Sequence, residues 1–179
     1  KAYYRGKYGH KMHDQGDWQN SQSYPLLTYL DGEKIKQFDD FPPVTDPQMV
    51  NIVRLNCDDE QLMAKVADTI KDGGVAGIIV NTVKRAQELY KMVPEGIPKL
   101  LLHSAFLATE RAELEEKLQE CIGKGADRPE KMVVIGTQVL EQSLDIDFDV
   151  LFTDIAPMDL VLQRMGRMHR HNIKRPRQL

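Results

Sequence analysis

Hydrophobic and polar positions follow two different periods from residue 51 onward. Short apolar runs, typical of buried strands, are separated by stretches in which apolar residues recur every three to four positions, as in amphipathic helices. The expected strands cover residues 51–55, 75–80, 99–103, 131–136 and 149–154, and the expected helices 58–72, 83–92, 110–122 and 159–171, with a short turn or helix at 138–143. Solidly apolar strands that alternate with helices indicate a doubly wound α/β fold, a parallel sheet with helices on both faces.

Residues with turn and cap chemistry mark the ends of these elements. Asp58 is placed to begin one helix, and Gly73 and Gly74 end it. Asn81-Thr82 is expected to start the next helix, and Thr109 is expected to cap the helix after it.

The region before residue 49 has a different character. Three parts are expected: a polar, flexible lead-in (1–23), a hairpin with a Pro-rich connector (24–48), and the main α/β domain (49–179). The hairpin strands, 24–30 and 33–38, flank the two-residue turn signal Asp31-Gly32. Pro42, Pro43 and Pro47 follow and stiffen the connector.

Small polar residues follow the expected strands. In doubly wound sheets the ligand lies beyond the carboxyl ends of the strands. The residues in question are Asn81, Thr82, His103, Ser104, Thr137 and Asp154. They suit contacts to a ligand or to a backbone phosphate. The chain contains neither G-x-G-x-x-G after its first strand nor G-x-x-x-x-G-K-[ST] anywhere, so it offers no phosphate-cradling loop of its own.

The stretch LVLQRMGRMHRHN (160–172) presents cations on an apolar helix. At about 100° per residue, one face carries Gln163, Gly166, Arg167 and Arg170 together. Val161, Met165 and Met168 lie on the opposite face and are expected to pack inward. A mid-helix glycine lets a ligand approach the backbone, and planar guanidiniums grip phosphate, so we interpret this face as an anion site rather than a solvated basic surface.

The distribution of charge supports an anionic partner at this end of the chain. The formal net charge of the 179 residues is −3, yet no acidic residue follows Asp159, and six basic residues do. A face that grips phosphate without a cradle implies that the cradle lies on another domain. Cys57 and Cys121 have no metal-ligand spacing and fit buried thiols in a reducing cytoplasm. We expect no metal site of the chain's own, no membrane span and a soluble, cytoplasmic protein.

A second informative stretch is GTQVLEQSLDIDFD (136–149). Its three alternating aspartates resemble the start of a calcium loop, but the required glycine is missing and Ala156 stands at the closing position. Because the stretch lies between two core strands, it places polar side chains at the carboxyl edge of the sheet near the arginine helix. These are Thr137, Glu141, Gln142, Ser143 and Asp145.

Three motifs together resemble those of a known family. QRMGRMHR (163–170) matches the Q-R-x-G-R-x-x-R pattern of motif VI in superfamily 2 helicases, GTQVLEQSLDID resembles motif V, and GIIVNTVKRAQELY (77–90) resembles motif IV. They occur in the family's order and cover about residues 50–172. EQSLDIDFD, LLHSAF and YPLLT look most like the CRISPR-associated helicase–nuclease of type I systems. Ala105 stands where that family commonly has an arginine, which removes one candidate phosphate contact.

The resemblance implies the second RecA-like lobe of a two-lobed ATP-dependent motor. ATP and Mg²⁺ would then be bound mainly by a first lobe that is absent from this chain. By motif position, the implied arginine fingers are Arg167 and Arg170, with Gln163 on the phosphate side. Residues implied at the nucleotide are Asp145, Gly166, Ser143 and Gln142, and those at a nucleic-acid backbone are Asn81, Thr82, His103, Ser104 and Thr137.

The implied function is that of an ATP-dependent DNA helicase or translocase in CRISPR interference, active in the full-length protein and inactive as this fragment. Expected partners are single-stranded DNA, the first lobe, a nuclease domain and a CRISPR RNA-guided surveillance complex. Two alternatives remain open. One is a lobe of another superfamily 2 motor, an RNA helicase or a restriction translocase. The other is a nucleic-acid-binding module without catalysis.

Overall fold

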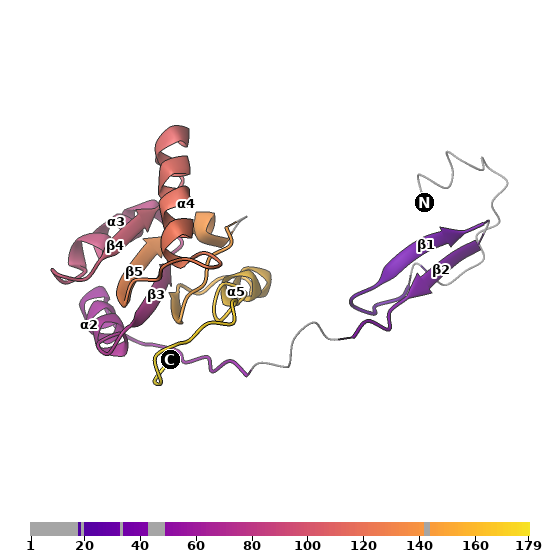
Figure 1. Cartoon of the computed structure of the whole chain (residues 1–179), viewed down its shortest axis with the longest axis horizontal. Helices are drawn as coiled ribbons and strands as arrows, with labels where there is room; N and C mark the ends of the chain where they lie inside the picture. The colour runs from indigo at the N-terminus through magenta and orange to yellow at the C-terminus, as the bar shows by residue number, and fades with distance from the viewer. Residues whose placement is uncertain (1–17, 19, 33, 43–48, 142–143) are drawn as a thin grey trace. The chain divides into compact units, whose positions relative to one another are not determined.

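The computed structural model describes residues 18, 20–32, 34–42, 49–141 and 144–179. The chain divides into two compact units, Lys1–Val53 and Arg54–Leu179, and Figure 1 shows the elements of each. The second unit is called the larger unit below. The expected lead-in, 1–23, lies almost wholly outside the described residues, as do Pro43 and Pro47 of the expected connector.

The first unit contains the predicted β-hairpin. β1 (Leu27–Asp31) pairs antiparallel with β2 (Lys34–Phe38), from Leu27 opposite Phe38 to Asp31 opposite Lys34. The hairpin is therefore confirmed, but Asp31 belongs to the strand rather than to the turn. Gly32 follows it with a φ of +62°, a conformation that glycine adopts without strain.

The larger unit is built on a four-stranded parallel sheet. Its strands are β3 (Gly74–Ile79), β4 (Lys99–Leu102), β5 (Lys131–Gly136) and β6 (Val150–Thr153), in the order β4-β5-β3-β6. All three pairings are parallel, so the carboxyl ends of the strands meet at one edge. The expected doubly wound α/β fold is confirmed.

The strand expected at 51–55 is absent: this segment is neither helix nor strand. Ile52 and Val53 are 74% and 73% exposed. A run of β-branched residues has strand propensity, but a strand also needs a hydrogen-bonded neighbour, and none of the described strands pairs with this segment.

The helices follow the predicted order. They are α2 (Asp59–Thr69), α3 (Val83–Met92), α4 (Ala108–Ile122), the 3₁₀ turn η3 (Gln138–Glu141) and α5 (Met158–Met165). Asp58 and Thr82 cap α2 and α3 as predicted. The prediction for Thr109 is wrong, because α4 begins one residue earlier, at Ala108. There Glu110 accepts a hydrogen bond from the backbone N–H of Leu107 at 3.2 Å.

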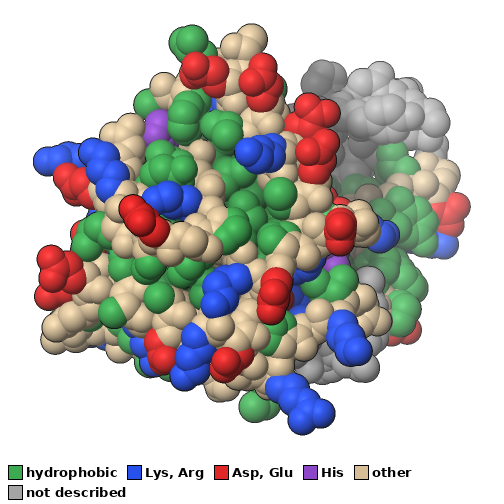
Figure 2. All heavy atoms as spheres, turned by 60° about the vertical axis from the view of Figure 1, so that its left-hand side comes forward, with side chains coloured by type: hydrophobic (Ala, Val, Ile, Leu, Met, Phe, Trp, Pro, Cys, Tyr) green, Lys and Arg blue, Asp and Glu red, His purple; other side chains and the backbone are tan. Residues whose placement is uncertain are grey.

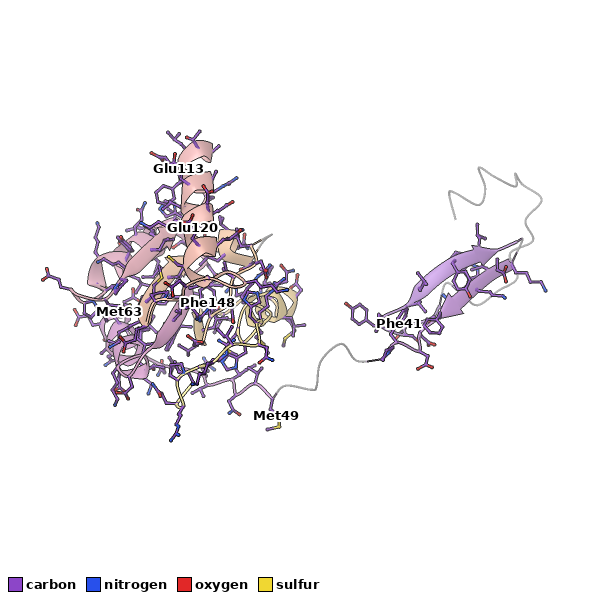
Figure 3. All side chains as sticks on the ribbon, viewed as in Figure 1. Phe41, Met49, Met63, Glu113, Glu120 and Phe148 are labelled. Atoms are coloured by element: carbon purple, nitrogen blue, oxygen red, sulfur yellow. The ribbon has the colours of Figure 1, made fainter. Side chains whose placement is uncertain are left out.

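Both faces of the sheet are covered by apolar side chains. Alternate residues of β3 point to opposite faces. Ile78 packs with the residues of α2 and α3, while Ile79 packs with those of α4. Phe148 is wholly buried in the second cluster, and Figure 3 shows it inside the larger unit while Glu113 lies on the outer part of α4. The ring of Phe148 takes up the space that a side chain on Gly77 would need.

The surface is mixed in charge. Figure 2 shows Lys and Arg side chains interspersed with Asp and Glu on the face in view, with hydrophobic side chains between them. Recognition of an anion on that face would therefore depend on a few placed groups rather than on one broad basic surface.

Cys57 is exposed, contrary to the expectation of two buried thiols. Among the described residues, no helix has the length and apolar character needed to cross a membrane.

Candidate functional site

The helix that carries the motif-VI-like sequence is shorter than predicted. α5 ends at Met165, and Gly166 is its C-cap, with its N–H donating to the carbonyl of Leu162 at 3.0 Å. The expectation of one helix over 159–171, with Gly166 in its middle, is therefore wrong. Glycine disfavours helix continuation, and the backbone beyond it finds other partners: Phe148 donates to the Arg167 carbonyl at 2.8 Å.

The single helical face expected for Gln163, Arg167 and Arg170 does not form, because only Gln163 is in the helix. Gln163 is exposed. Gly166 is also exposed, and a Cβ placed on it would meet only helix carbonyls, at 3.4 Å and 3.5 Å. The expected inward stripe is also wrong. Val161, Met165 and Met168 are only half-buried, and the buried residue of α5 is Arg164.

Arg167 instead contacts the last residue of η3 and Leu144. Its two Nη atoms donate to the carbonyls of Glu141 and Leu144, both at 2.6 Å. Its Nε is buried and has no hydrogen-bond partner among the described residues. Burial lowers the pKa of the Arg167 guanidinium, the neighbouring charge of Arg170 lowers it further, and Asp145 opposes both.

Arg170 pairs with the residue that follows Leu144. Its Nε lies 3.0 Å from Asp145, and the same carboxylate oxygen is 3.0 Å from Nε2 of His171. The hydrogen bond from His171 lowers the pKa of Asp145, burial opposes this, and the charges of His171 and Arg170 add to the lowering. Three residues that the motifs predict at a nucleotide, Arg167, Arg170 and Asp145, are thus brought together. Gln142 and Ser143, expected beside them, lie outside the described residues.

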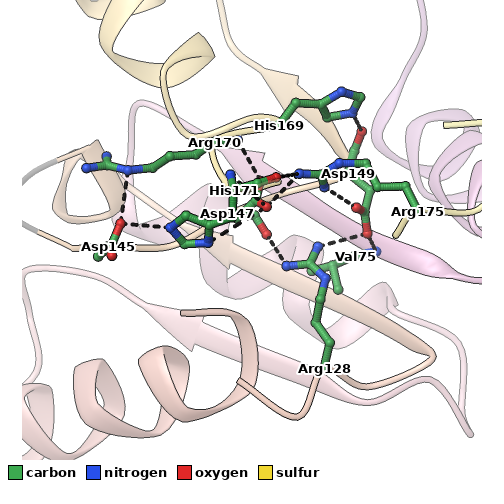
Figure 4. A network of polar contacts seen from close by, with 9 residues as sticks. All are labelled: Val75, Arg128, Asp145, Asp147, Asp149, His169, Arg170, His171 and Arg175. Carbon is green, nitrogen blue, oxygen red and sulfur yellow. Dashed lines mark hydrogen bonds and ion pairs between the residues drawn. The ribbon is translucent and has the colours of Figure 1, made fainter. Parts of the chain in front are cut away.

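Two further aspartates of the same stretch anchor the chain after α5 (Figure 4). Asp147 is fully buried and accepts from the backbone N–H of Arg170 at 3.0 Å and from the Arg175 guanidinium at 2.6 Å. Asp149 accepts from the backbone N–H of Val75 at 2.7 Å and from Arg128 at 2.9 Å, and it also pairs with Arg175. This network fixes the backbone from which Arg170 projects.

The network was missed in the sequence, although a signal for it exists. Asp145, Asp147 and Asp149 alternate with Ile146 and Phe148, both of which are fully buried. An extended segment with one apolar side must turn its other side to polar partners. The partners are arginines that are distant in sequence, and nothing in the spacing identifies them.

Arg164 is the second feature that the sequence did not reveal. Its side chain is 0% exposed and pairs with Glu141, which is 2% exposed, through Nε at 2.7 Å. Nη1 donates to the Thr153 hydroxyl at 2.6 Å, and Nη2 donates to Oδ1 of Asn81 at 3.3 Å. A buried charge needs such a set of partners. Arg164 is therefore committed within the larger unit and is not presented to a ligand.

The residues expected to contact nucleic acid follow β3, β4 and β5 at one edge of the sheet. Thr82 and Ser104 are exposed, and the Thr82 hydroxyl also caps α3. Asn81 is exposed, but its side chain donates to the Ile155 carbonyl at 2.9 Å as well as accepting from Arg164. The side chains of His103 and Thr137 are buried, at 3% and 7% exposure.

His103 is buried by contacts with two neighbouring side chains. Its ring stacks on Phe106 with centroids 4.2 Å apart, and its Nε2 lies 3.2 Å from Nε2 of Gln87. Its Nδ1 is buried without a partner among the described residues. Of the His103-Ser104 pair, Ser104 is the side chain that a nucleic-acid backbone can reach in this structure.

Comparison with known proteins places this geometry in context. A family model described as the C-terminal part of the CRISPR-associated nuclease/helicase Cas3 matches residues 72–173, more than half of the chain. The CRISPR-associated nuclease/helicase Cas3 of Streptococcus thermophilus is 52% identical over 157 residues, which cover 86% of this chain and 17% of that protein. The CRISPR-associated endonuclease/helicase Cas3 of Escherichia coli K12 is 30% identical over 168 residues, which cover 87% of this chain and 19% of that protein. The chain thus spans about a fifth of the length of these relatives.

Solved structures agree with the sequence comparison. The crystal structure of T. fusca Cas3-ATP matches with a TM-score of 0.78 and 31% identity, over 99% of this chain and 23% of that one. A chain of a CRISPR RNA-guided surveillance complex, pre-nicking, matches with a TM-score of 0.72 and 30% identity, over 99% of this chain and 24% of that one. The family resemblance that the motifs predict is confirmed.

Proposed function

The chain belongs to the CRISPR-associated nuclease/helicase Cas3 family, as part of its C-terminal region, and we propose that it is the second RecA-like lobe of an ATP-dependent DNA helicase. In this proposal the lobe supplies Arg167 and Arg170 to an ATP site that it shares with a first lobe of the same protein. It also forms half of a track for single-stranded DNA.

The proposal depends on two arginines that contact neighbouring residues, Leu144 and Asp145. Arg167 donates to the carbonyl of Leu144, Arg170 pairs with the next residue, Asp145, and Arg167 has a buried Nε that its neighbours leave unpartnered among the described residues. Two adjacent cations repel unless an anion joins them, and a guanidinium fork fits phosphate oxygens. This donor set suits a triphosphate rather than a metal ion, so the accompanying Mg²⁺ is assigned mainly to the first lobe.

The chemistry of phosphoryl transfer gives these arginines their role. Negative charge spreads over the γ-phosphate oxygens in the transition state, and one well-placed arginine contributes about 10³–10⁵ in rate. Arg167 is held by two carbonyls and Arg170 by a half-exposed ion pair, so Arg170 has the greater freedom to move toward a phosphate. When a nucleotide binds, Asp145 would release Arg170 and accept a hydrogen bond from a ribose hydroxyl instead. Gln163 and Gly166 are exposed on the same segment, and the proposal assigns them to the nucleotide.

The strand-end residues are assigned to the nucleic acid. Thr82 and Ser104 offer exposed hydroxyls at the carboxyl edge of the sheet and suit backbone phosphates. The CRISPR RNA-guided surveillance complex, pre-nicking, includes a chain similar to this one, which supports a CRISPR RNA-guided complex as a partner. The names of the relatives support a nuclease domain elsewhere in the protein, and the cytoplasm is the expected location.

The test uses the full-length protein. ATP turnover is measured without nucleic acid, with single-stranded DNA and with single-stranded RNA of matched length. The proposal expects turnover that DNA stimulates more than RNA does. Stimulation by RNA alone would favour the RNA-helicase alternative, and nucleic-acid binding without any ATP turnover would favour the non-catalytic module.

A further inference from the structure

Arg164 lies between the two candidate sites. On one side it pairs with Glu141, and the backbone carbonyl of that same residue accepts from Arg167. On its other side it donates to Asn81, which immediately precedes Thr82 in the loop assigned to nucleic acid. A chain of direct contacts therefore runs from the Asn81–Thr82 loop through Arg164 and Glu141 to Arg167.

The hydrogen bonds that link the Asn81–Thr82 loop to Arg167 differ in length. The Arg164–Glu141 pair is 2.7 Å long and is buried at both ends, whereas the Arg164–Asn81 hydrogen bond is 3.3 Å long and Asn81 is exposed. The weaker and more accessible contact is the one that a ligand at the loop can change. The guanidinium is planar and stiff, so a shift at its Nη2 turns the fork that also holds Glu141.

Asn81 is itself tied to the end of β6. Its backbone N–H donates to the Asp154 carboxylate at 2.9 Å, and its side-chain amide donates to the Ile155 carbonyl at 2.9 Å. Asp154 also pairs with Arg85 of α3. These contacts anchor the loop to α3 and to the two residues that follow β6, and the side-chain oxygen of Asn81 is its direct contact with Arg164.

We propose that Arg164 is a positioning residue that couples occupancy of the Asn81–Thr82 loop by single-stranded DNA to the placement of the Arg167 guanidinium. The inference rests on the proposed function and adds to it the route by which DNA stimulates ATP turnover. Arg164 touches neither ligand. It acts by holding Glu141, whose carbonyl fixes one end of the Arg167 fork.

The experiment measures ATP turnover by the full-length protein without DNA and at saturating single-stranded DNA, and compares the ratio of the two. Saturation removes any contribution from weaker DNA binding. Arg164→Lys keeps the charge beside Glu141 but loses the fork, and we expect its stimulation ratio to fall about fivefold or more, the size of a typical coupling between sites. The melting temperature and the KM for ATP are recorded in parallel.

Two further variants separate coupling from plain structural support. Asn81→Ala removes the exposed end of the contact chain without burying a lone charge, and the ratio is expected to fall as it does in Arg164→Lys. Thr153→Val removes another hydrogen bond of Arg164 but lies off the route to the loop, so it is expected to keep the wild-type ratio. If Arg164→Lys fails to fold, the comparison of Asn81→Ala with Thr153→Val still tests the coupling.

Wild-type stimulation in Arg164→Lys or Asn81→Ala would overturn the inference, as would an equal loss in Thr153→Val and Asn81→Ala. Failure of the proposed function looks different, because the wild-type protein itself would then show no DNA-stimulated turnover. A loss of stimulation restricted to Arg164→Lys and Asn81→Ala, with the KM for ATP unchanged, supports the coupling route.

Discussion

Arg170 and Asp145 hold each other in an ion pair of 3.0 Å while their side chains remain 41% and 50% exposed. Surface pairs of this kind contribute little to stability, about 0–1 kcal/mol. In the proposed site the two residues bind opposite ends of a nucleotide, so ATP must separate them. Breaking this pair therefore tests function with little disturbance of the fold.

Arg170→Ala in the full-length protein is expected to reduce ATP turnover by about 10³-fold or more, with a melting temperature close to that of the wild type. Single-stranded DNA binding should change little, and Arg170→Lys should restore little turnover, because an ammonium lacks the planar fork. Lys174→Ala, an exposed basic residue of the same segment, is the matched control. Lost DNA binding with retained turnover would make this segment a nucleic-acid surface instead.

Arg167→Ala is expected to lower both ATP turnover and thermal stability. The variant leaves the carbonyls of Glu141 and Leu144 without their donors, and a buried unsatisfied group costs about 1–3 kcal/mol. Thermal melting and steady-state ATPase assays measure the two effects separately. A drop in turnover without any drop in melting temperature would contradict the contacts seen here.

A pair of glycine substitutions distinguishes packing from ligand approach. Gly77→Ala is expected to destabilise the fold by about 1–3 kcal/mol, because the new Cβ would lie 2.8 Å from ring carbons of Phe148. In Gly166→Ala the new Cβ would contact only helix carbonyls, so this variant should leave stability nearly unchanged. If a nucleotide approaches the backbone at Gly166, the second variant raises the KM for ATP. Denaturant unfolding and ATPase titrations provide the comparison.

Ser104→Ala tests the nucleic-acid edge without removing a charge or a helix cap. Loss of one hydrogen bond to phosphate is expected to weaken single-stranded DNA binding by about 2- to 12-fold, the equivalent of 0.5–1.5 kcal/mol, equally for unrelated sequences. The salt dependence, about −0.7 per phosphate neutralised on a single strand, should not change because serine is neutral. A sequence-dependent loss would argue for contacts to bases.

Asp149 gives the larger unit a specific response to acid. Burial raises the pKa of its carboxyl, but the N–H of Val75 and the guanidiniums of Arg128 and Arg175 outweigh burial and leave the pKa below its ordinary value of 3.8. Because the folded pKa is depressed, this stabilisation is complete above the ordinary pKa and is lost as the pH falls through the folded one. Urea unfolding between pH 7 and pH 2 should show a decline below about pH 4 that Asp149→Asn flattens.

The sequence predicted best what depends on local pattern. The four observed strands, the Asp58 and Thr82 caps and the hairpin are set by neighbours close in the chain, so period and cap chemistry suffice. The strand at 51–55 failed because pairing is a tertiary property. Helix α5 was extended too far because the wheel treats Gly166 as one more helical position, while the backbone beyond it pairs with Phe148.

The sequence predicted which residues form the candidate site better than it predicted how those residues are arranged. Motif position brought Arg167, Arg170 and Asp145 into one hypothesis, and the structure brings them together through the chain after η3 rather than along a helix. In the sequence, Arg164, Arg167 and Arg170 recur every three residues, and nothing distinguishes the first from the other two. Its burial depends on Glu141, Thr153 and Asn81, which lie on three other segments, and no spacing within residues 160–172 encodes that difference.

The buried aspartates have a consequence for how the protein is made. Val75 is the second residue of β3, and its N–H is satisfied by Asp149, which in turn pairs with Arg175. A ribosome adds about 5–20 residues per second, so roughly 5–20 s pass between the synthesis of Val75 and that of Arg175. During that interval β3 is complete, but first Asp149 and then Arg175 have still to be added. The buried Asp149 therefore lacks the Arg175 guanidinium until Arg175 has been synthesised, which happens after all four described strands of the sheet.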